Sequence, residues 1–429
     1  ANVTIGGESA ASGAAFSAGS LAQSDTQSGS GVFTVNGLLD VTTGGVSINS
    51  EQVVLNAGIK TIAGFDVQAN EDFGLLRIRA GSGGVSLVSG ATLVTTPSDA
   101  ARKASEIEIV SAGAITLLGD LVTLGADRTD VEGGIGGHGG DITIKTTAAG
   151  DPLTISSINL SGGHAAEPTN GNTSFNGNGG DAGKLTLDTN ASEIRLAGGQ
   201  IVAVGGDAAN ADFSPGSATK ISFGDVVKLV DGDVSVRTIR ADDIAGDHGS
   251  EIAFSSGIEG PYRLTLHATD VEITDVVGSQ TNVAQRLDQL TISTTNVMLV
   301  DDVFTTGNQT FTSPVIGLFG TRYETASGTI TAKGQTYLAQ PTTAMAAGRV
   351  MFDGALDSIW VEDSDPQVSA SSSLDVFGDA TFKQAVGSQY ALGNLLVTGN
   401  TTFDFGGATK TVTSSGTQTY EGAVSLANN

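Results

Sequence analysis

Acidic residues in glycine-rich loops are the side chains of this 429-residue chain whose type and spacing best suit chemistry. Asp141, Asp181 and Asp207 each follow a Gly-Gly pair, and Asp231 and Asp233 flank a single glycine in a compact turn. Oxygen-rich loops of this kind suit Ca²⁺. The sequence has neither a complete Gly-Gly-x-Gly-x-Asp array nor an EF-hand loop. No cofactor is therefore predicted outright, and calcium is the possible one, with these five residues as candidate ligands.

Histidines are the second group that could bind a metal. Three of the four lie in glycine-rich loops: His138, His164 and His248. His138 and His164 are 26 residues apart, close to one repeat of the chain, so they could stack as a metal pair. The alternative is that all three are exposed loop residues.

Catalysis would need carboxylates that converge on one face. The candidates are Asp242-Asp243, Asp301-Asp302 and Asp363-Ser364-Asp365. Adjacent carboxylates in a strand point to opposite faces, so these predict solvated turn residues and no catalytic centre. The glycine-rich loops are not phosphate-binding loops, because no Gly-Lys-Ser/Thr and no helix follows them.

The composition favours many short strands joined by tight turns. Glycine contributes 60 residues, charged residues 15% and aromatic residues 5%, and 39% of the chain is hydrophobic. Glycine and β-branched residues are poor helix formers. The net charge of −26 argues against a nucleic-acid partner, since phosphate recognition needs Lys and Arg. There is no cysteine, and no run of about 20 apolar residues predicts a transmembrane helix.

Short apolar–polar–apolar segments recur from Val32 onward, often 8 to 15 residues apart. Each places two side chains in a core and one toward solvent. Examples are Val46–Ile48, Leu76–Ile78, Ile107–Ile109, Ile142–Ile144, Leu185–Leu187, Leu264–Leu266 and Leu290–Ile292. The only mild candidates for helix are Ser98–Glu106 and Thr281–Gln289, and the second is expected as one short turn before Leu290.

A phrase of Gly, Gln, Thr and an aromatic residue repeats in the last third of the chain. Its glutamines are Gln309, Gln335, Gln389 and Gln418, spaced 26, 54 and 29 residues apart. A period of about 27 residues is typical of stacked repeats, each burying its apolar face on the next. The amides could form a ladder between repeats or cap turns. The aromatic residues could fill a core corner or line an outer groove.

These patterns predict an all-β parallel β-helix, or β-solenoid, with glycine-rich loop insertions. A sandwich or a closed barrel would need a regular series of hairpin turns, which the sequence lacks. With coils about 4.8 Å apart, the rod would be on the order of 80 Å long. The insertions, at about 131–250, are expected as excursions from one face.

Three regions are predicted. Residues 1–30 are a low-complexity lead-in or an exchanged strand. Residues 31–260 form a β-helix with the glycine-rich excursions, and residues 261–429 form a β-helix with the repeated phrases. A regular Thr ladder would indicate an ice- or polysaccharide-binding face, but Thr follows no strict period in the sequence.

Residues 260–311 contain GPYRLTL, VEI, LDQLTI and TTGNQTF, and residues 416–426 read GTQTYEGAVSL. These phrases resemble a repeat of filamentous-haemagglutinin-like bacterial surface exoproteins and adhesins. The resemblance implies a right-handed β-helix used as a spacer or adhesive rod, extracellular or on the surface of a Gram-negative bacterium. The Asn-Pro-Asn-Leu type phrase that opens the secretion domain of two-partner exoproteins is absent from the sequence.

The sequence therefore predicts a non-enzymatic structural or adhesive rod of a bacterial cell surface or biofilm matrix. Its expected partners are copies of itself, joined end to end into filaments, or host and cell-surface glycans and proteins. The alternative is a carbohydrate-active β-helix enzyme, either a polysaccharide lyase or a hydrolase.

Overall fold

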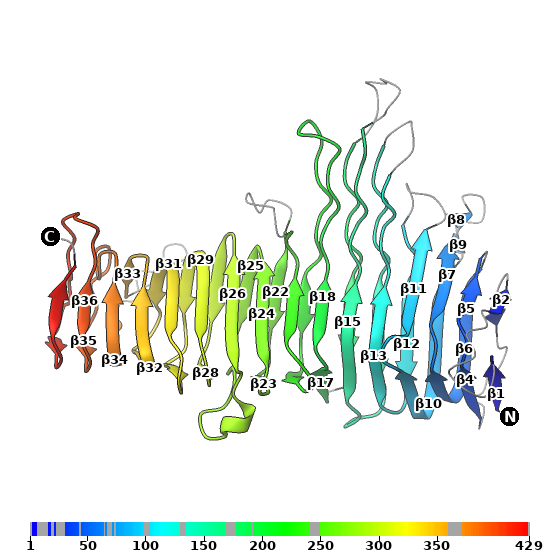
Figure 1. Cartoon of the computed structure of the whole chain (residues 1–429), viewed down its shortest axis with the longest axis horizontal. Helices are drawn as coiled ribbons and strands as arrows, with labels where there is room; N and C mark the ends of the chain where they lie inside the picture. The colour runs from blue at the N-terminus through cyan, green and yellow to red at the C-terminus, as the bar shows by residue number, and fades with distance from the viewer. Residues whose placement is uncertain are drawn as a thin grey trace. The chain divides into compact units, whose positions relative to one another are not determined.

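A computed structural model describes most of the chain (Figure 1). The chain divides into two compact units. Unit 1 comprises residues 1–243 and 247–251, and unit 2 comprises residues 244–246 and 252–429. The described residues are 2–6, 16–18, 21–22, 31–42, 44–63, 65–66, 71–72, 74–97, 103–128, 134–167, 177–190, 192–240, 249–358 and 371–427.

Each coil of unit 1 contributes a strand to each of three parallel sheets. The first sheet contains β1 (Val3–Ile5), β4 (Val32–Val35), the ends of β6 (Val46–Leu55) and β10 (Leu76–Leu87), the starts of β13 (Ile115–Val122) and β15 (Leu153–Asn159), β17 (Glu193–Leu196) and β20 (Val226–Leu229). The second contains β2 (Phe16–Ala18), β5 (Leu39–Val41), β7 (Ile59–Ala63), β11 (Thr92–Pro97), the ends of β13 and β15, β18 (Gly199–Val202) and β21 (Val234–Arg237). The third contains β3 (Leu21–Ala22), the starts of β6 and β10, β12 (Ile107–Ser111), β14 (Ile142–Thr146), β16 (Leu185–Asp188) and β19 (Ile221–Phe223).

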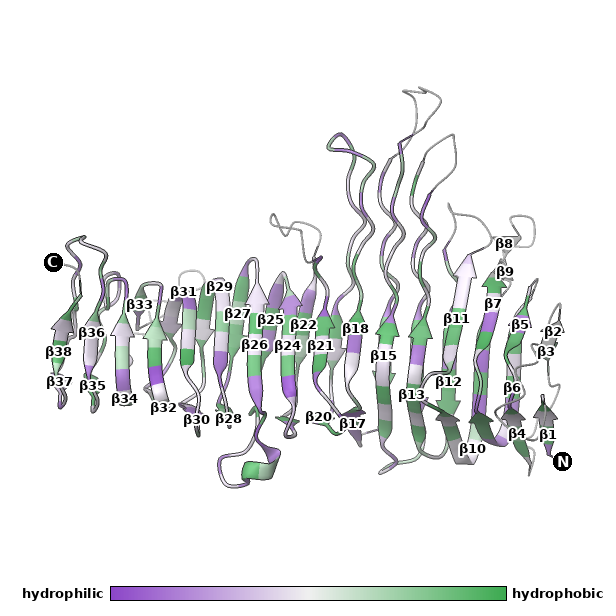
Figure 2. Cartoon of the chain, in the orientation of Figure 1, coloured by the Kyte–Doolittle hydropathy of each residue, from purple (hydrophilic) through white to green (hydrophobic). Residues whose placement is uncertain are grey.

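Apolar residues of successive coils stack directly in the core of unit 1. One column runs through Val46, Leu76, Ile107, Ile142 and Leu185, all buried. Burying one such side chain stabilises the fold by about 1.5–3 kcal/mol. The alternation of apolar and polar residues along the strands, visible in Figure 2, therefore produces the stacking.

The described residues of the N-terminal segment belong to the first coil. Val3–Ile5 pairs in parallel with Phe33–Val35, and Phe16–Ala18 pairs with Leu39–Val41. The structure thus shows them continuing the sheets of their own chain. The alternating Val3-Thr4-Ile5 pattern is the local reason, because it matches the pattern of the coil beside it.

Unit 2 has the same three-sheet plan. One sheet contains β24 (Arg263–Ala268), β26 (Gln289–Thr294), the start of β29 (Gln309–Leu318), the start of β31 (Ile330–Leu338), the ends of β32 (Thr342–Phe352) and β34 (Leu374–Phe382), β36 (Thr401–Phe403) and β38 (Val424–Leu426). A second contains β25 (Asp270–Ile273), β27 (Val297–Val300), the ends of β29 and β31, and β33 (Leu356–Asp357). A third contains β23 (Ile258–Glu259), β28 (Val303–Thr305), β30 (Arg322–Thr325), the starts of β32 and β34, β35 (Leu395–Val397) and β37 (Gln418–Tyr420). Strand β22 (Glu251–Phe254) crosses the boundary between the units.

Phenylalanines stack along one core column of unit 2. The rings of Phe352 and Phe382 have centroids 5.6 Å apart and planes 3° apart, and those of Phe382 and Phe403 are 5.6 Å and 22° apart. Parallel in-register strands force this stacking, since Phe352, Phe382 and Phe403 pair directly with one another. Offset aromatic stacking adds about 0.5–1.5 kcal/mol per pair to the burial of the rings.

Two local elements depart from the parallel plan. Strands β8 (Phe65–Asp66) and β9 (Glu71–Asp72) form an antiparallel pair in the excursion after β7. The helix η1 (Val283–Gln285) is a single 3₁₀ turn with Asn282 as its N-cap, as the sequence predicted. Among the described residues no helix is long and apolar enough to cross a membrane. The predicted all-β parallel β-helix with glycine-rich insertions is confirmed.

Candidate functional site: a glycine-rich bundle

The glycine-rich excursions of unit 1 form a bundle of extended segments beside the coils. Each excursion leaves from the second sheet and returns to the third, after β13, β15 and β18. Figure 1 shows the three pairs of segments side by side above these strands. The outgoing segments are 123–128, 160–167 and 203–209, and the returning segments are 134–141, 177–184 and 214–220.

Hydrogen bonds between the segments follow a three-residue period. In segment 134–141, the N–H groups of Gly136 and Gly139 donate to segment 177–184 at 3.0 and 2.8 Å. The N–H groups of the following residues, Gly137 and Gly140, donate instead to segment 123–128, at 2.9 and 2.8 Å. A backbone whose N–H groups point in the same direction at every third residue, and which has no internal hydrogen bond, is of the polyproline II type. These segments are therefore not β-strands.

The next returning segment repeats the pattern. The N–H groups of Gly179 and Ala182 donate to segment 214–220 at 3.0 and 2.9 Å. The N–H groups of the following residues, Gly180 and Gly183, donate to segment 160–167 at 2.9 and 2.8 Å. Each inner segment thus bonds to its two neighbours with a three-residue period, whereas the residues of a β-strand alternate with a period of two.

A chain of glycine-to-glycine hydrogen bonds runs through the middle of the bundle. Each N–H donates to the carbonyl oxygen of the preceding member, with N···O distances of 2.8–2.9 Å. The members in order are Gly137, Gly163, Gly180, Gly206 and Gly216. The inner layer therefore satisfies its backbone groups with backbone, as a buried segment must.

Close approach makes glycine necessary at these positions. A Cβ atom on Gly206 would lie 1.8 Å from the carbonyl oxygen of Gly163, and one on Gly216 would lie 1.9 Å from that of Gly180. Such contacts place Cα–H groups against carbonyl oxygens, a weak attraction that a methyl group would replace with a clash. The requirement is for space, and φ at these glycines is not positive.

Every third residue of the bundle faces outward. The segment Gly136 to Asp141 reads Gly-Gly-His-Gly-Gly-Asp, and Gly162 to Glu167 reads Gly-Gly-His-Ala-Ala-Glu. The two glycines that open each of three triplets are buried, Ala165 and Ala166 are half-buried, and the third residue of every triplet is half-buried or exposed. This small-small-x period is the sequence signal that would have predicted the bundle. Neither the two-residue strand period nor the 3.6-residue helix period contains this signal.

Side chains at the outward positions accept hydrogen bonds from the next segment. On the outgoing layer, Asp127 Oδ1 accepts the N–H of His164 at 2.8 Å, and His164 Nδ1 accepts that of Asp207 at 3.0 Å. An outward N–H has no neighbouring backbone to meet, so an acceptor side chain takes that place. Asp127 and His164 therefore have a structural role.

The returning layer has the same arrangement. His138 Nδ1 accepts the N–H of Asp181 at 2.9 Å, and Asp181 Oδ1 accepts that of Ser217 at 2.7 Å. Asp141 Oδ1 accepts the N–H of Lys184 at 2.8 Å, while its Oδ2 lies 2.7 Å from Lys103 Nζ.

Each of the two loop histidines faces the carboxylate of the same residue whose N–H it accepts. His164 Nδ1 lies 2.7 Å from Asp207 Oδ2, and His138 Nδ1 lies 3.4 Å from Asp181 Oδ2. A neutral ring accepts the N–H through Nδ1, and a protonated ring donates to the carboxylate instead. Asp207 also forms an ion pair with Arg240. His138 and His164 pair with different residues, in different layers.

The calcium candidates are separated by this arrangement. Backbone N–H groups donate to the carboxylates of Asp141 and Asp181, and the Asp207 carboxylate faces His164. The other two candidates, Asp231 and Asp233, lie in the turn between β20 and β21. Within the described part of the chain, no group of three or more His, Asp or Glu side chains is placed to hold a metal ion. Calcium binding remains a prediction from sequence.

Of the carboxylate pairs considered for catalysis, only Asp301-Asp302 is described. Asp301 Oδ1 accepts the N–H of Asp302 at 2.7 Å, and Asp302 Oδ1 accepts that of Arg322 at 2.8 Å. Both act as turn residues. The pairs at 242–243 and 363–365, and His248, lie outside the described residues.

Threonines form a column on one sheet of unit 2 that the sequence did not reveal, and two of its members, Thr331 and Thr381, are buried. Residues paired in register along this column are Thr265, Thr291, Thr310, Thr331, Met351, Thr381, Thr402 and Ser425. A hollow of about 410 Å³ lies on this face, lined by Thr329, Thr331, Gly348, Arg349, Met351 and Asp379. Its one carboxylate, Asp379, already accepts the N–H of Asn400 through Oδ1 at 2.8 Å.

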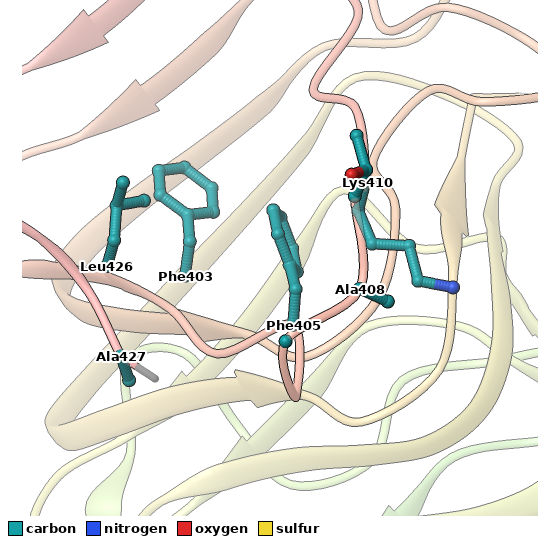
Figure 3. A pocket seen from close by; sticks show the side chains of 8 residues that line it. Phe403, Phe405, Ala408, Lys410, Leu426 and Ala427 are labelled. Carbon is teal, nitrogen blue, oxygen red and sulfur yellow. The ribbon is translucent and has the colours of Figure 1, made fainter. Parts of the chain in front are cut away.

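A second hollow, of about 450 Å³, lies beside the last member of the phenylalanine stack (Figure 3). Its lining is Phe403, Phe405, Gly407, Ala408, Thr409, Lys410, Leu426 and Ala427. Lys410 is the only titratable group among these residues. The hollow is thus mainly apolar and holds no acid–base pair.

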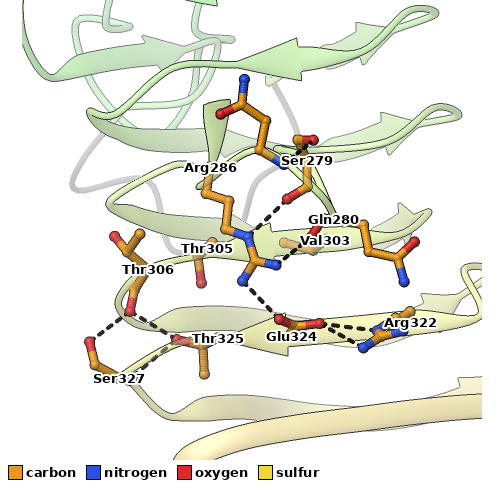
Figure 4. A network of polar contacts seen from close by, with 12 residues as sticks. Ser279, Gln280, Arg286, Val303, Thr305, Thr306, Arg322, Glu324, Thr325 and Ser327 are labelled. Carbon is orange, nitrogen blue, oxygen red and sulfur yellow. Dashed lines mark hydrogen bonds and ion pairs between the residues drawn. The ribbon is translucent and has the colours of Figure 1, made fainter. Parts of the chain in front are cut away.

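A buried arginine fixes the excursion that contains η1 (Figure 4). The Arg286 side chain is 7% exposed, and its guanidinium donates to the carbonyl oxygens of Ser279 and Gln280 at 2.9 and 2.8 Å. It also lies 2.8 Å from Glu324 Oε1 and over the Phe304 ring. One side chain therefore joins the excursion to two neighbouring coils.

The repeated glutamines do not occupy one column. Gln309 and Gln418 each donate through Nε2 to the carbonyl oxygen six residues earlier, at 3.2 Å, which is the turn-capping role. Gln335 and Gln389 instead bond to each other, Nε2 to Oε1, at 3.3 Å. The turn-capping interpretation thus holds for Gln309 and Gln418, while the ladder is reduced to a single amide–amide contact between Gln335 and Gln389.

A comparison of the chain with protein-family models, curated proteins and solved structures finds no match. The architecture and the site stand on the geometry alone.

Proposed function

We propose that the protein is a non-enzymatic structural and adhesive component of a bacterial cell surface or extracellular matrix. The β-helical coils serve as a scaffold, and the glycine-rich bundle and the outward sheet faces carry the contacts. The observation that carries the proposal is the bundle. Its middle is backbone packed on backbone, which leaves no room for a substrate, so only its outward residues can meet a partner.

The resemblance of residues 260–311 and 416–426 to adhesin repeats supports the same function. It points to the surface of a Gram-negative bacterium and to host or cell-surface glycans and proteins as partners. Assembly into filaments belongs to the proposal, because a parallel β-sheet can add strands of another chain at an unpaired edge.

Adhesion of beads coated with the purified chain tests the proposal. The beads are offered bacterial cells and isolated matrix, and the matched variant has segments 123–141, 160–184 and 203–220 replaced by short Gly-Ser links. Circular dichroism establishes that the variant keeps its β-structure. We expect coated beads to adhere and the variant to lose most of this adhesion. Equal, background-level adhesion by both proteins would contradict the adhesive role.

Negative-stain microscopy, with and without calcium, tests filament formation. Filaments that lengthen with protein concentration are expected. Separate particles at every concentration would remove self-assembly and leave the adhesive role to the bead assay.

The hollow on the threonine face is the observation that favours the carbohydrate-active alternative. Arg349 and Asp379 line it together with hydroxyl groups. A hydrolase needs two carboxylates flanking the scissile bond, and this lining supplies one, so a lyase is the more consistent form. Release of unsaturated products from polysaccharides, abolished in Arg349→Ala, would establish that activity.

A further inference from the structure

Two tyrosines that follow the repeated glutamines lie on the outside of unit 2. Tyr390 is 43% exposed and Tyr337 is half-buried. Tyr337 pairs with Asp357 on the next coil, and Leu356, beside Asp357, pairs with Val386 on the coil after that. The coils that carry Tyr337 and Tyr390 are therefore at most two steps apart, or about 10 Å along the axis. The two rings are thus available on one face, close enough to meet one ligand.

The glutamines join the two tyrosines into one surface. Gln335 Nε2 lies 3.3 Å from Gln389 Oε1, although the residues are 54 positions apart. Gln389 is exposed and Gln335 is half-buried. Each amide offers both donors and an acceptor, so this surface can bond hydroxyl groups in either direction.

A buried carboxylate holds the surface in place. Asp357 is 0% exposed, and its Oδ1 accepts the N–H groups of Gln389 and Tyr390 at 2.9 and 3.1 Å. The Gln335 amide lies 3.5 Å from its Oδ2, and the N–H of Ser358 donates to the carbonyl oxygen of Tyr390 at 3.3 Å. The backbone that carries Tyr390 is therefore fixed before any ligand arrives, which lowers the entropic cost of binding.

The electrostatics of this surface select the ligand class. The residues that form it, Gln335, Tyr337, Asp357, Gln389 and Tyr390, include no Lys or Arg and one buried carboxylate. Burial, the Asp357 carboxylate and Tyr390 all raise the pKa of Tyr337, so its hydroxyl stays a neutral donor. The chain carries a net charge of −26, which repels anionic polymers.

Aromatic faces and amides together match a sugar chain. The C–H face of a pyranose ring packs on the electron-rich face of a tyrosine, and its hydroxyls bond to amides. Aromatic anchors that expose two faces along an axis suit an extended polymer better than a compact ligand. We propose that Tyr337, Tyr390, Gln335 and Gln389 form a binding surface for a neutral polysaccharide. This inference rests on the proposed adhesive function and names its ligand class.

Affinity electrophoresis of the full chain in gels containing neutral polysaccharides (mannan, galactomannan, β-glucan, dextran) or the anionic polygalacturonate tests the inference. Retardation by at least one neutral polymer and none by polygalacturonate is expected. Tyr390→Ala should raise the apparent dissociation constant about tenfold, from the size of aromatic stacking terms. Tyr390→Phe should keep most of the affinity. Tyr262→Ala, a half-buried tyrosine outside this surface, is the matched control.

The outcomes separate the two proposals. If coated beads adhere but no neutral polysaccharide retards the chain, the sugar-binding surface is wrong and the adhesive function stands. Retardation that is equal in Tyr390→Ala and the wild type also overturns the assignment, since Tyr390 is exposed and its loss leaves the core intact. Failure of both assays removes both proposals.

Discussion

Gly180 and Gly137 approach so closely that a Cβ atom on Gly180 would lie 1.9 Å from the Gly137 carbonyl oxygen. That oxygen also accepts the N–H of Gly163 at 2.8 Å. The contact joins three bundle segments, 134–141, 160–167 and 177–184, which lie side by side although two strands separate the first from the second in the chain. The bundle is therefore intolerant of any side chain at its middle, and this defines a direct test.

Gly180→Ala should open the bundle without unfolding the coils. The carbonyl of Gly137 cannot move without breaking its hydrogen bond and those beside it, each contributing about 1 kcal/mol. We expect a local loss of about 2–4 kcal/mol, seen as faster amide exchange at Gly183 and Gly206. Gly224→Ala is the control, because a Cβ atom there meets nothing within 4 Å. Unchanged exchange in Gly180→Ala would contradict the close packing.

Asp181→Asn should be nearly neutral, whereas Asp181→Ala should destabilise. The amide oxygen of Asn can still accept the N–H of Ser217, and Ala cannot; the difference should be about 1 kcal/mol. Thermal melts of both variants measure it. Repeating the melts with calcium chloride separates the two roles of this residue. A calcium-dependent rise in Tm that disappears in Asp181→Asn would show that the carboxylate binds the ion.

Arg286→Ala should cost about 3 kcal/mol of stability, the typical result of breaking a buried ion pair. Two carbonyl oxygens lose their donor, and Glu324 retains only its contact with Arg322, at 2.9 Å. Urea denaturation measures the loss. Arg263→Ala breaks the exposed pair with Asp288 and should cost less than about 1 kcal/mol. Equal effects of the two changes would be inconsistent with the burial of Arg286.

Removing the charge of Glu106 or of Glu108, two residues apart, should change the stability of the fold in opposite directions. Burial, followed by the Glu108 carboxylate, raises the pKa of Glu106. Burial also opposes ionisation of Glu108, but the hydrogen bond and charge of Arg77 outweigh it and lower the pKa of Glu108. A carboxyl group whose pKa is raised in the folded state destabilises the fold as pH rises through that pKa. A carboxyl group whose pKa is lowered stabilises the fold, and this stability is lost as pH falls through the lowered pKa.

Thermal melts of Glu106→Gln and Glu108→Gln from about pH 3 to pH 7 test this sign. At pH 7 Glu106→Gln should raise Tm and Glu108→Gln should lower it. Both differences from the wild type should shrink toward pH 3, where the carboxyls are protonated in folded and unfolded chains. A shift of the same sign for both variants at pH 7 would refute the assignment.

Much of the fold was predictable because its signals are local. The alternation in Val46–Ile48 or Leu290–Ile292 specifies which side chains face a core, whatever the partner strand. The lack of a hairpin series excluded antiparallel barrels, and the turn before Leu290 was correctly expected. The candidate site was predicted only in part. The sequence located the glycine-rich loops and offered Asp141 and Asp181 as calcium ligands, which stays a prediction. It did not show that these carboxylates accept the N–H groups of Lys184 and Ser217.

The amino-acid sequence by itself determined the strands, their inward faces and the places where the chain leaves the coils, since these follow from side chains one or two positions apart. Only the tertiary structure decided which residues stack. Members of the threonine column are 19 to 30 residues apart in sequence, because each coil carries a loop of different length. The same holds for Gln335 with Gln389 and for Gly137 with Gly180. Their contacts depend on the number of residues in each coil and its loop, and no local sequence pattern encodes that number.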